Sequence, residues 1–167
     1  MEMEKQRTER KLKTNKELKV FIKTFKRGET FKKDEITYLK VLKDKLLISR
    51  AVRHGVTGQL FNEIKMNSPF DDNQWSVFLN IHIRTLQRYK VEKDHIYKSM
   101  QSERIFELAE VISMGNLVFD SPDDFQNWLV TPSLSLGREK PINLLDNSYG
   151  KDLVIAELNR IEYGIFV

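Results

Sequence analysis

The chain of 167 residues contains no cysteine. This absence excludes disulfide bridges, zinc sites built from thiolates and cysteine nucleophiles, and it is compatible with a reducing compartment. No apolar run approaches the roughly 18 residues needed to cross a bilayer, and the first residues lack the apolar core of a signal peptide. We therefore expect a soluble, cytoplasmic protein with no membrane partner.

Recognisable catalytic and metal-binding motifs are also missing. There is no GxSxG elbow and no phosphate-binding P-loop, and the pairs Asp71–Asp72 and Asp123–Asp124 lie at expected helix starts, where capping and the helix dipole explain them. His54, His82 and His95 lack the HExxH spacing of a zinc site. The sequence thus predicts no catalytic residue, metal, cofactor or small-molecule substrate. An enzyme of unrecognised type is the weakest alternative.

Charge is distributed unevenly along the chain. Residues 1–100 hold 23 Lys and Arg against 13 Asp and Glu, whereas residues 101–167 hold 5 against 11. The first part is therefore strongly basic and the second part acidic. A basic excess of this size favours a polyanion as the partner of the first part, although a solvated lysine-rich surface would give the same count.

The hydrophobic pattern is helical throughout. No segment alternates at period two, whereas apolar residues recur at helical spacing. Three such stripes are Leu18, Phe21, Ile22 and Phe25, then Ile105, Leu108, Ala109 and Ile112, and finally Val154, Leu158 and Ile161. The sequence therefore predicts an all-α fold, with two hydrophobic units that meet near residue 100.

Capping residues predict where several helices begin and end. The pattern stays helical from Asp34, a possible N-cap, to His54, with Gly55 as the terminator. Helix starts are expected at Asp71, which has Gln74 three residues on, and at Ser121, which is followed by Pro122. Glycines at Arg27-Gly28 and at Gly164 are expected to stop the first and last helices.

The N-terminal arm and one glycine motif leave alternatives open. Residues 1–45 hold 15 basic and 8 acidic side chains, and the tip before Lys16 has almost nothing apolar, so we expect that tip to be mobile. The basic amphipathic helix that follows either packs or stays free. Residues 55–58 fit the GxxG loop of a KH domain, but that loop needs flanking strands, which the pattern does not show.

Residues 72–91 have the pattern of a helix-turn-helix, in which two helices pack across a tight turn. Asn80 stands at the turn and is one of the few non-glycine residues that adopt a left-handed conformation at low cost. Ser76 is small where the helices cross. The apolar contacts between the helices are expected from Trp75, Leu79, Ile81, Leu86 and Tyr89.

The second helix of this pair has a polar outward face. Arginine can bond guanine through two donors, glutamine can bond adenine, and threonine and lysine suit phosphates. An ordinary helical hairpin with a charged exterior is the alternative, and His82 can also serve as a helix cap. The predicted contacts to operator DNA are His82, Ile83, Arg84, Thr85, Gln87, Arg88 and Lys90.

The C-terminal part places aromatic and prolyl residues around a glycine-containing turn between Phe125 and Leu145, and a helix restarts at Pro141. The last three residues, 165–167, are all apolar and follow Gly164. Because chain ends are usually polar, we expect this tail to pack, either on its own domain or on a partner.

Two stretches together resemble a known family. Residues 128–145 read W-L-x-T-P-x-x-x-L-G-x-x-x-P-I-x-L-L, followed by Tyr149-Gly150 and by L-x-R-I-E-Y-G-I at residues 158–165. This order is similar to the toxin-binding domain of the Xre/MbcA/ParS antitoxins, and R-T-L-Q-R-Y at residues 84–89 resembles the Xre-type helix-turn-helix of the same proteins. The sequence departs from the family at four positions. Asn80 replaces the usual turn glycine, and Arg138 stands where a second glycine is common. Ser133 stands where the family often has asparagine, and Asp120 where glycine often follows Val-Phe.

The resemblance covers roughly residues 46–167 and implies an Xre-like helix-turn-helix unit (46–100) and a helical toxin-binding and dimerisation unit (101–167). The basic arm (1–45) lies outside the resemblance and is expected from its composition. The resemblance also implies a homodimeric antitoxin that neutralises a RES-domain toxin, which attacks NAD, and represses the shared operon. A stand-alone regulator without a toxin is the alternative. The candidate toxin contacts are Leu136, Gly137, Arg138, Arg160, Glu162, Tyr163, Gly164, Ile165, Phe166 and Val167.

Overall fold

The computed structural model describes residues 16–24, 38–92 and 94–164. Within these ranges the chain forms ten α-helices and one short 3-10 helix and no β-strand, so the all-α prediction is confirmed. Thr57 and Ile96 form an isolated antiparallel bridge. Residues 1–15, 25–37 and the tail 165–167 lie outside the described part, and the expectations for the arm's tip and for the apolar tail fall there.

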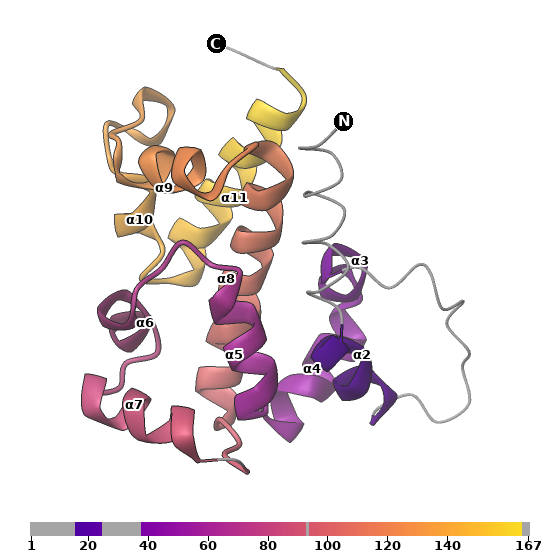
Figure 1. The fold of residues 1–167 in the computed structure, drawn as a ribbon. Coiled ribbons are helices and arrows are strands. Elements are labelled where there is room, and N and C mark those ends of the chain that lie inside the picture. The colour runs from indigo at the N-terminus through magenta and orange to yellow at the C-terminus, as the bar shows by residue number, and fades with distance from the viewer. Residues whose placement is uncertain (1–15, 25–37, 93, 165–167) are drawn as a thin grey trace.

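The first six helices lead into and include the predicted helix-turn-helix (Figure 1). They are α2 (Lys16–Lys23), α3 (Tyr38–Lys43), α4 (Lys45–His54), α5 (Gly58–Met66), α6 (Asp72–Phe78) and α7 (Ile83–Val91). The remaining elements are α8 (Ser99–Val118), α9 (Pro122–Val130), the 3-10 helix η1 (Leu134–Leu136), α10 (Pro141–Leu144) and α11 (Ser148–Glu162).

Helix α8 is the central element of the fold. It packs along α11 and against α3 and α4, and Figure 1 shows it running from the end of the molecule that carries α7 to the end that carries α9. Half of its residues are buried, including the predicted stripe of Ile105, Leu108, Ala109 and Ile112. Helices that are apolar on several sides lie inside a fold, so α8 connects the two predicted units through one core.

One predicted helix is divided in two. Residues 38–54 do not form one helix, because the chain breaks at Asp44, whose carboxylate accepts a hydrogen bond from the Leu47 backbone N–H at 3.0 Å and caps α4. The prediction of a continuous helix to His54 is therefore wrong here, while its proposed start at Asp34 lies outside the described residues. Gly55 ends α4 as predicted, with φ of 94°.

The other predicted helix boundaries are confirmed. Asp71 and Gln74 form a reciprocal capping box at the start of α6, and the Ser121 hydroxyl accepts from the Asp124 N–H at 3.1 Å at the start of α9. Helix α11 ends at Glu162, just before Gly164, which has φ of 65°. Helix α2 ends at Lys23, and the predicted stop at residues 27–28 lies outside the described ranges.

Residues 16–24 of the arm pack on the rest of the fold. Leu18, Phe21 and Ile22 are buried, and the carboxylate of Glu63 on α5 accepts from the Glu17 backbone N–H at 2.8 Å and from the Tyr38 hydroxyl at 2.7 Å. Burial and this hydrogen bond raise the pKa of Tyr38, which keeps its hydroxyl a donor. Glu63 thus ties α2 and α3 to α5.

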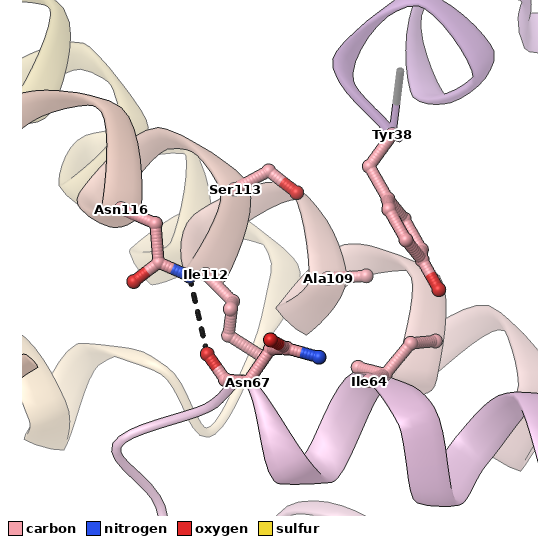
Figure 2. A pocket seen from close by; sticks show the side chains of 7 residues that line it. All are labelled: Tyr38, Ile64, Asn67, Ala109, Ile112, Ser113 and Asn116. Atoms are coloured by element: carbon pink, nitrogen blue, oxygen red, sulfur yellow. Dashed lines mark hydrogen bonds between the residues drawn. The ribbon is translucent and has the colours of Figure 1, made fainter. Parts of the chain in front are cut away.

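A pocket lies between α3, α5 and α8, beside this contact (Figure 2). Its wall is made of apolar and amide side chains together with the Tyr38 ring, and the Asn116 amide donates to the Asn67 carbonyl at 3.1 Å. The pocket is lined by the side chains with which α3, α5 and α8 pack on one another, so it is a gap in the packing of these helices.

Two glycines allow close packing in the C-terminal part. A side chain at Gly115 on α8 would overlap the Phe125 ring of α9, and one at Gly150 on α11 would overlap the carbonyl oxygen of Leu144 on α10. Both positions therefore need a residue without a Cβ, which fixes how α9 and α10 lie on the two long helices.

Candidate functional site

Helices α6 and α7 form the predicted hairpin, joined by a tight turn over residues 79–82. The Asn80 N–H donates to the Val77 carbonyl and the Ile81 N–H to the Ser76 carbonyl, both at 3.0 Å. Asn80 has φ of 50°, as predicted from its ability to adopt the left-handed region. The turn is therefore set by local hydrogen bonds and by a residue suited to it.

The two helices share an apolar core. Trp75, Leu79 and Leu86 are buried, while Ile81 and Tyr89 are partly buried and pack against the core, so all five residues belong to the apolar core. The Trp75 ring meets Phe61 of α5 edge-on at a centroid distance of 5.1 Å. Its indole N–H donates to the Ser68 hydroxyl at 3.1 Å, and Phe70 packs on its other side. The hairpin is thereby anchored on α5.

The predicted DNA-contacting residues of α7 divide between an exposed face and a flank. Arg84, Gln87 and Arg88 are exposed and, at spacings of three and four, share one face. His82 is exposed and caps α7, its Nδ1 accepting from the Arg84 N–H at 3.2 Å. Ile83 and Thr85 are half-buried, and Ile83 packs against the core.

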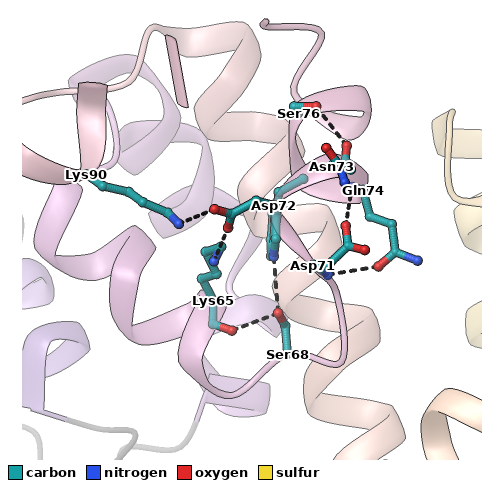
Figure 3. Close-up of polar contacts among 9 residues, drawn as sticks. Lys65, Ser68, Asp71, Asp72, Asn73, Gln74, Ser76 and Lys90 are labelled. Atoms are coloured by element: carbon teal, nitrogen blue, oxygen red, sulfur yellow. Dashed lines mark hydrogen bonds and ion pairs between the residues drawn. The ribbon is translucent and has the colours of Figure 1, made fainter. Parts of the chain in front are cut away.

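Lys90, the last predicted DNA contact, is held by an ion pair inside the hairpin. Its ammonium and that of Lys65 on α5 both bind the carboxylate of Asp72, the first residue of α6 (Figure 3). Hydrogen bonds from Lys65 and then Lys90 lower the pKa of Asp72, so the carboxylate stays ionised. The cluster joins α5, α6 and α7.

The segment after α7 is packed by a cluster of three rings, of which two are stacked and the third meets them edge-on. His95 lies flat on Tyr89, with centroids 3.5 Å apart, and meets Tyr97 edge-on at 4.7 Å. The Gly58 N–H donates to the His95 carbonyl and the Tyr97 N–H to the Val56 carbonyl, both at 2.8 Å. The KH alternative for residues 55–58 is wrong, because helices α4 and α5, and no strands, flank this segment.

In the C-terminal part, α9 presents an aromatic cluster to the end of α8. Phe125 is buried and stacks on Phe119 at 5.6 Å, and the half-buried Trp128 lies 5.6 Å from Phe119. Trp128 therefore belongs to the packing of its own domain. The aromatic residues around the predicted turn are thus structural anchors for the loop that follows.

The loop after α9 closes on itself. The Arg138 N–H donates to the Ser133 carbonyl at 2.8 Å, and the Ser133 N–H donates to the Glu139 carbonyl at 3.0 Å. Gly137 and Arg138 both have left-handed φ values, 68° and 67°. Gly137 and Arg138 are exposed, whereas Leu136 is half-buried, so these three predicted toxin contacts lie at a projecting loop next to α11.

Two of the four departures from the family, Asn80 and Arg138, fall on residues with a left-handed backbone, whereas Ser133 and Asp120 do not. Within the described part of the chain, Asn80 and Arg138 are the non-glycine residues with positive φ. Each position therefore keeps the backbone conformation that a glycine would favour while carrying a side chain. Asparagine tolerates this conformation better than arginine does.

Helix α11 presents an exposed apolar stripe that sequence reasoning missed. Tyr149, Leu153 and Tyr163 are 87%, 55% and 76% exposed, and Ala156 between them is also exposed. Their spacing of i, i+4, i+7 and i+14 puts them on one face of the helix. The same spacing is readable in the sequence, but a helical stripe is more often buried, and here it faces solvent.

The predicted contacts near the end of α11 lie beside this stripe. Glu162, Tyr163 and Gly164 are exposed, whereas Arg160 is half-buried and pairs with Glu157 at 2.9 Å. Residues 165–167 lie outside the described part of the chain. The loop after α9 and the C-terminal end of α11 both lie at the end of the molecule away from α7 (Figure 1).

Residues 114–164 match the family model of the antitoxin Xre/MbcA/ParS C-terminal toxin-binding domain. The chain carries the toxin-binding domain of the Xre/MbcA/ParS antitoxins. The matched toxin-binding domain begins in the last turns of α8 and takes in α9, η1, α10 and α11. None of the curated proteins compared with the chain matches it.

The toxin-binding domain contains both the loop and the α11 stripe. Members of this antitoxin family are typically not enzymes. In the described ranges, no group of three or more histidine and carboxylate residues is placed to hold a metal ion, and no helix is long and apolar enough to span a bilayer.

Proposed function

We propose that this protein is the antitoxin of a type II toxin-antitoxin pair, which neutralises a RES-domain, NAD-attacking toxin by direct binding and represses its own operon. The observation that carries the proposal is the toxin-binding domain at residues 114–164. The hairpin of α6 and α7, with its exposed Arg84, Gln87 and Arg88, supports the second activity.

Toxin binding is assigned to the loop at Leu136–Arg138 and to the exposed face of α11. Aromatic and aliphatic side chains contribute most of the binding energy when they enter a partner's pocket, and Tyr149, Leu153 and Tyr163 are available for this. Glu162 and Gly164 are exposed at the end of the same helix, and the apolar residues 165–167 follow them in the sequence. The mechanism is occlusion: a protein that covers the toxin's NAD pocket needs no catalytic group of its own.

Operator binding is assigned to α7. Its exposed residues would reach base edges in the major groove, and His82, Thr85 and Lys90 would contact the backbone. Because helix-turn-helix proteins bind paired half-sites, we propose a homodimer on an inverted repeat with half-site centres about 10 bp, or a multiple of it, apart. The proposed division is residues 46–100 for DNA and residues 101–167 for dimerisation and toxin.

Co-expression with the neighbouring reading frame tests the toxin assignment. The expected result is that a RES-type protein encoded beside this gene stops growth alone, and that the full chain restores growth and co-purifies with it. A matched control carries the same chain truncated before residue 114, which removes the toxin-binding domain. Growth restored by that control would contradict the assignment. If the gene has no toxin gene beside it and its protein binds DNA only, the stand-alone regulator is favoured.

A further inference from the structure

The ion cluster beside the proposed recognition helix has an excess of one positive charge. The Asp72 carboxylate binds the ammonium groups of Lys65 and Lys90 through its two oxygens (Figure 3). One carboxylate neutralises one ammonium, so the cluster of two lysines and one aspartate has a net charge of about +1. The side chains of Lys65, Asp72 and Lys90 keep 20%, 31% and 29% of their surface exposed.

The position of this cluster suits a DNA phosphate. Lys90 lies on a flank of α7, off the exposed face that carries Arg84 and Arg88, while Lys65 lies at the end of α5. The neighbouring Asp71 caps α6, since its carboxylate accepts a hydrogen bond from the Gln74 N–H at 2.8 Å, and both lysines pair with Asp72 instead. Ammonium groups at the edge of a DNA-binding helix contact the backbone phosphates that set its register.

We propose that Lys65, Asp72 and Lys90 form a site for a DNA backbone phosphate, in which Asp72 holds Lys90 in the free protein and releases it to the phosphate on binding. Lys65 stays on Asp72 and keeps that carboxylate neutralised, so it acts as a positioning residue. Lys90 is the more exposed of the two lysines and lies on the helix that would face DNA. The proposal rests on the DNA binding proposed above.

The salt dependence of DNA binding distinguishes these roles, because each phosphate contact adds about 0.9 to the slope of log affinity against log salt. Asp72→Asn frees both lysines, so Lys65 also becomes available to a phosphate and the slope becomes steeper by about one contact. Lys90→Gln removes the wild-type contact and flattens the slope. Lys65→Gln also flattens it, although Lys65 stays on Asp72 and does not touch DNA in the wild-type complex, because Asp72 then retains Lys90. Combining Lys65→Gln with Asp72→Asn restores the wild-type slope.

The experiment is a titration of the full chain against a labelled non-operator duplex between 50 and 200 mM salt. One added contact makes the loss of affinity over this range about three- to fourfold larger. Asp94→Asn is the matched control, because it removes the same charge from an exposed position on the connection between α7 and α8. Melting temperatures establish that each variant is folded. Lys90→Gln changes a partly exposed side chain, so it tests the site even if Asp72→Asn does not fold.

Two results would overturn the proposal. Equal slopes for Asp72→Asn and Asp94→Asn would show that only net charge matters, and a wild-type slope for Lys65→Gln would remove its positioning role. If the wild-type protein binds DNA, either result would contradict the proposed phosphate site and leave the proposed DNA binding standing. A wild-type chain that binds no duplex at all would overturn the DNA-binding proposal and this site with it.

Discussion

The imidazole of His95 lies flat on the ring of Tyr89, with centroids 3.5 Å apart and planes 17° apart. This contact joins the end of α7 to the segment that leads into α8. Burial is the main cause that lowers the pKa of His95 below its ordinary value of 6.5, with Arg88 adding to the effect and Glu92 opposing it. His95 is therefore neutral in the folded protein at neutral pH.

The lowered pKa predicts a loss of stability in mild acid. Between pH 6.5 and the lower pKa of the folded state, the unfolded chain binds a proton at His95 more readily, so the free energy of unfolding falls as pH falls through this window. Replacing His95 by Phe should reduce this dependence. Melting temperatures at pH 8 and pH 5 check it, and an equal decrease in the wild type and in H95F would count against the account.

Gly150→Ala should destabilise the toxin-binding domain. A Cβ at this position would overlap the Leu144 carbonyl oxygen, which is backbone and cannot turn aside, so α10 must move. Overpacking of this kind costs about 1–3 kcal/mol of unfolding free energy. Ala156→Gly is a control on the exposed side of the same helix and should lose about 1 kcal/mol through helix propensity alone. A G150A variant as stable as the wild type by denaturant titration would disprove the close packing.

Arg138→Gly should stabilise the loop after α9. Arg138 has φ of 67°, a left-handed conformation that costs a non-glycine residue about 1–2 kcal/mol, and glycine removes this strain while adding about 0.5–1 kcal/mol of unfolded-state entropy. The net gain in unfolding free energy expected from denaturant unfolding is therefore small, about 0–1.5 kcal/mol. A loss of stability would mean that the arginine side chain makes favourable contacts that outweigh the strain.

Arg84→Ala or Arg88→Ala should weaken operator binding. If the residue bonds a base edge, the loss is ~1–3 kcal/mol for the operator with little change for other sequences. Both side chains are exposed on one face of α7, so their removal should leave the melting temperature unchanged. Binding to operator and scrambled duplexes measures the effect, and normal operator binding by the double variant would disprove the recognition-helix assignment.

The sequence predicted much of the fold because its signals are local. Capping at Asp71 and Ser121, the left-handed Asn80 and the stop at Gly55 each depend on residues a few positions apart. The break at Asp44 was missed because apolar residues continue at helical spacing across it, so periodicity does not reveal the second cap.

The candidate site was less predictable, since it depends on contacts between distant segments. The Lys65–Asp72–Lys90 cluster joins three helices, and nothing in the local pattern of Lys90 shows that a carboxylate holds it. For α11, periodicity reveals the apolar stripe but not which faces the core covers. Leu158 of the same helix is buried against α8, whereas Leu153 faces solvent.

The affinity of the purified toxin for α11 variants measures whether the exposed face of α11 binds the toxin. Tyr149→Ser combined with Leu153→Ser should weaken binding by about 2 kcal/mol or more, because buried aromatic and aliphatic anchors dominate interface energy. Leu46→Ser on α4, where the leucine is 60% exposed against 55% for Leu153, is the matched control and should bind like the wild type. Toxin affinity unchanged in the α11 double variant would contradict the account.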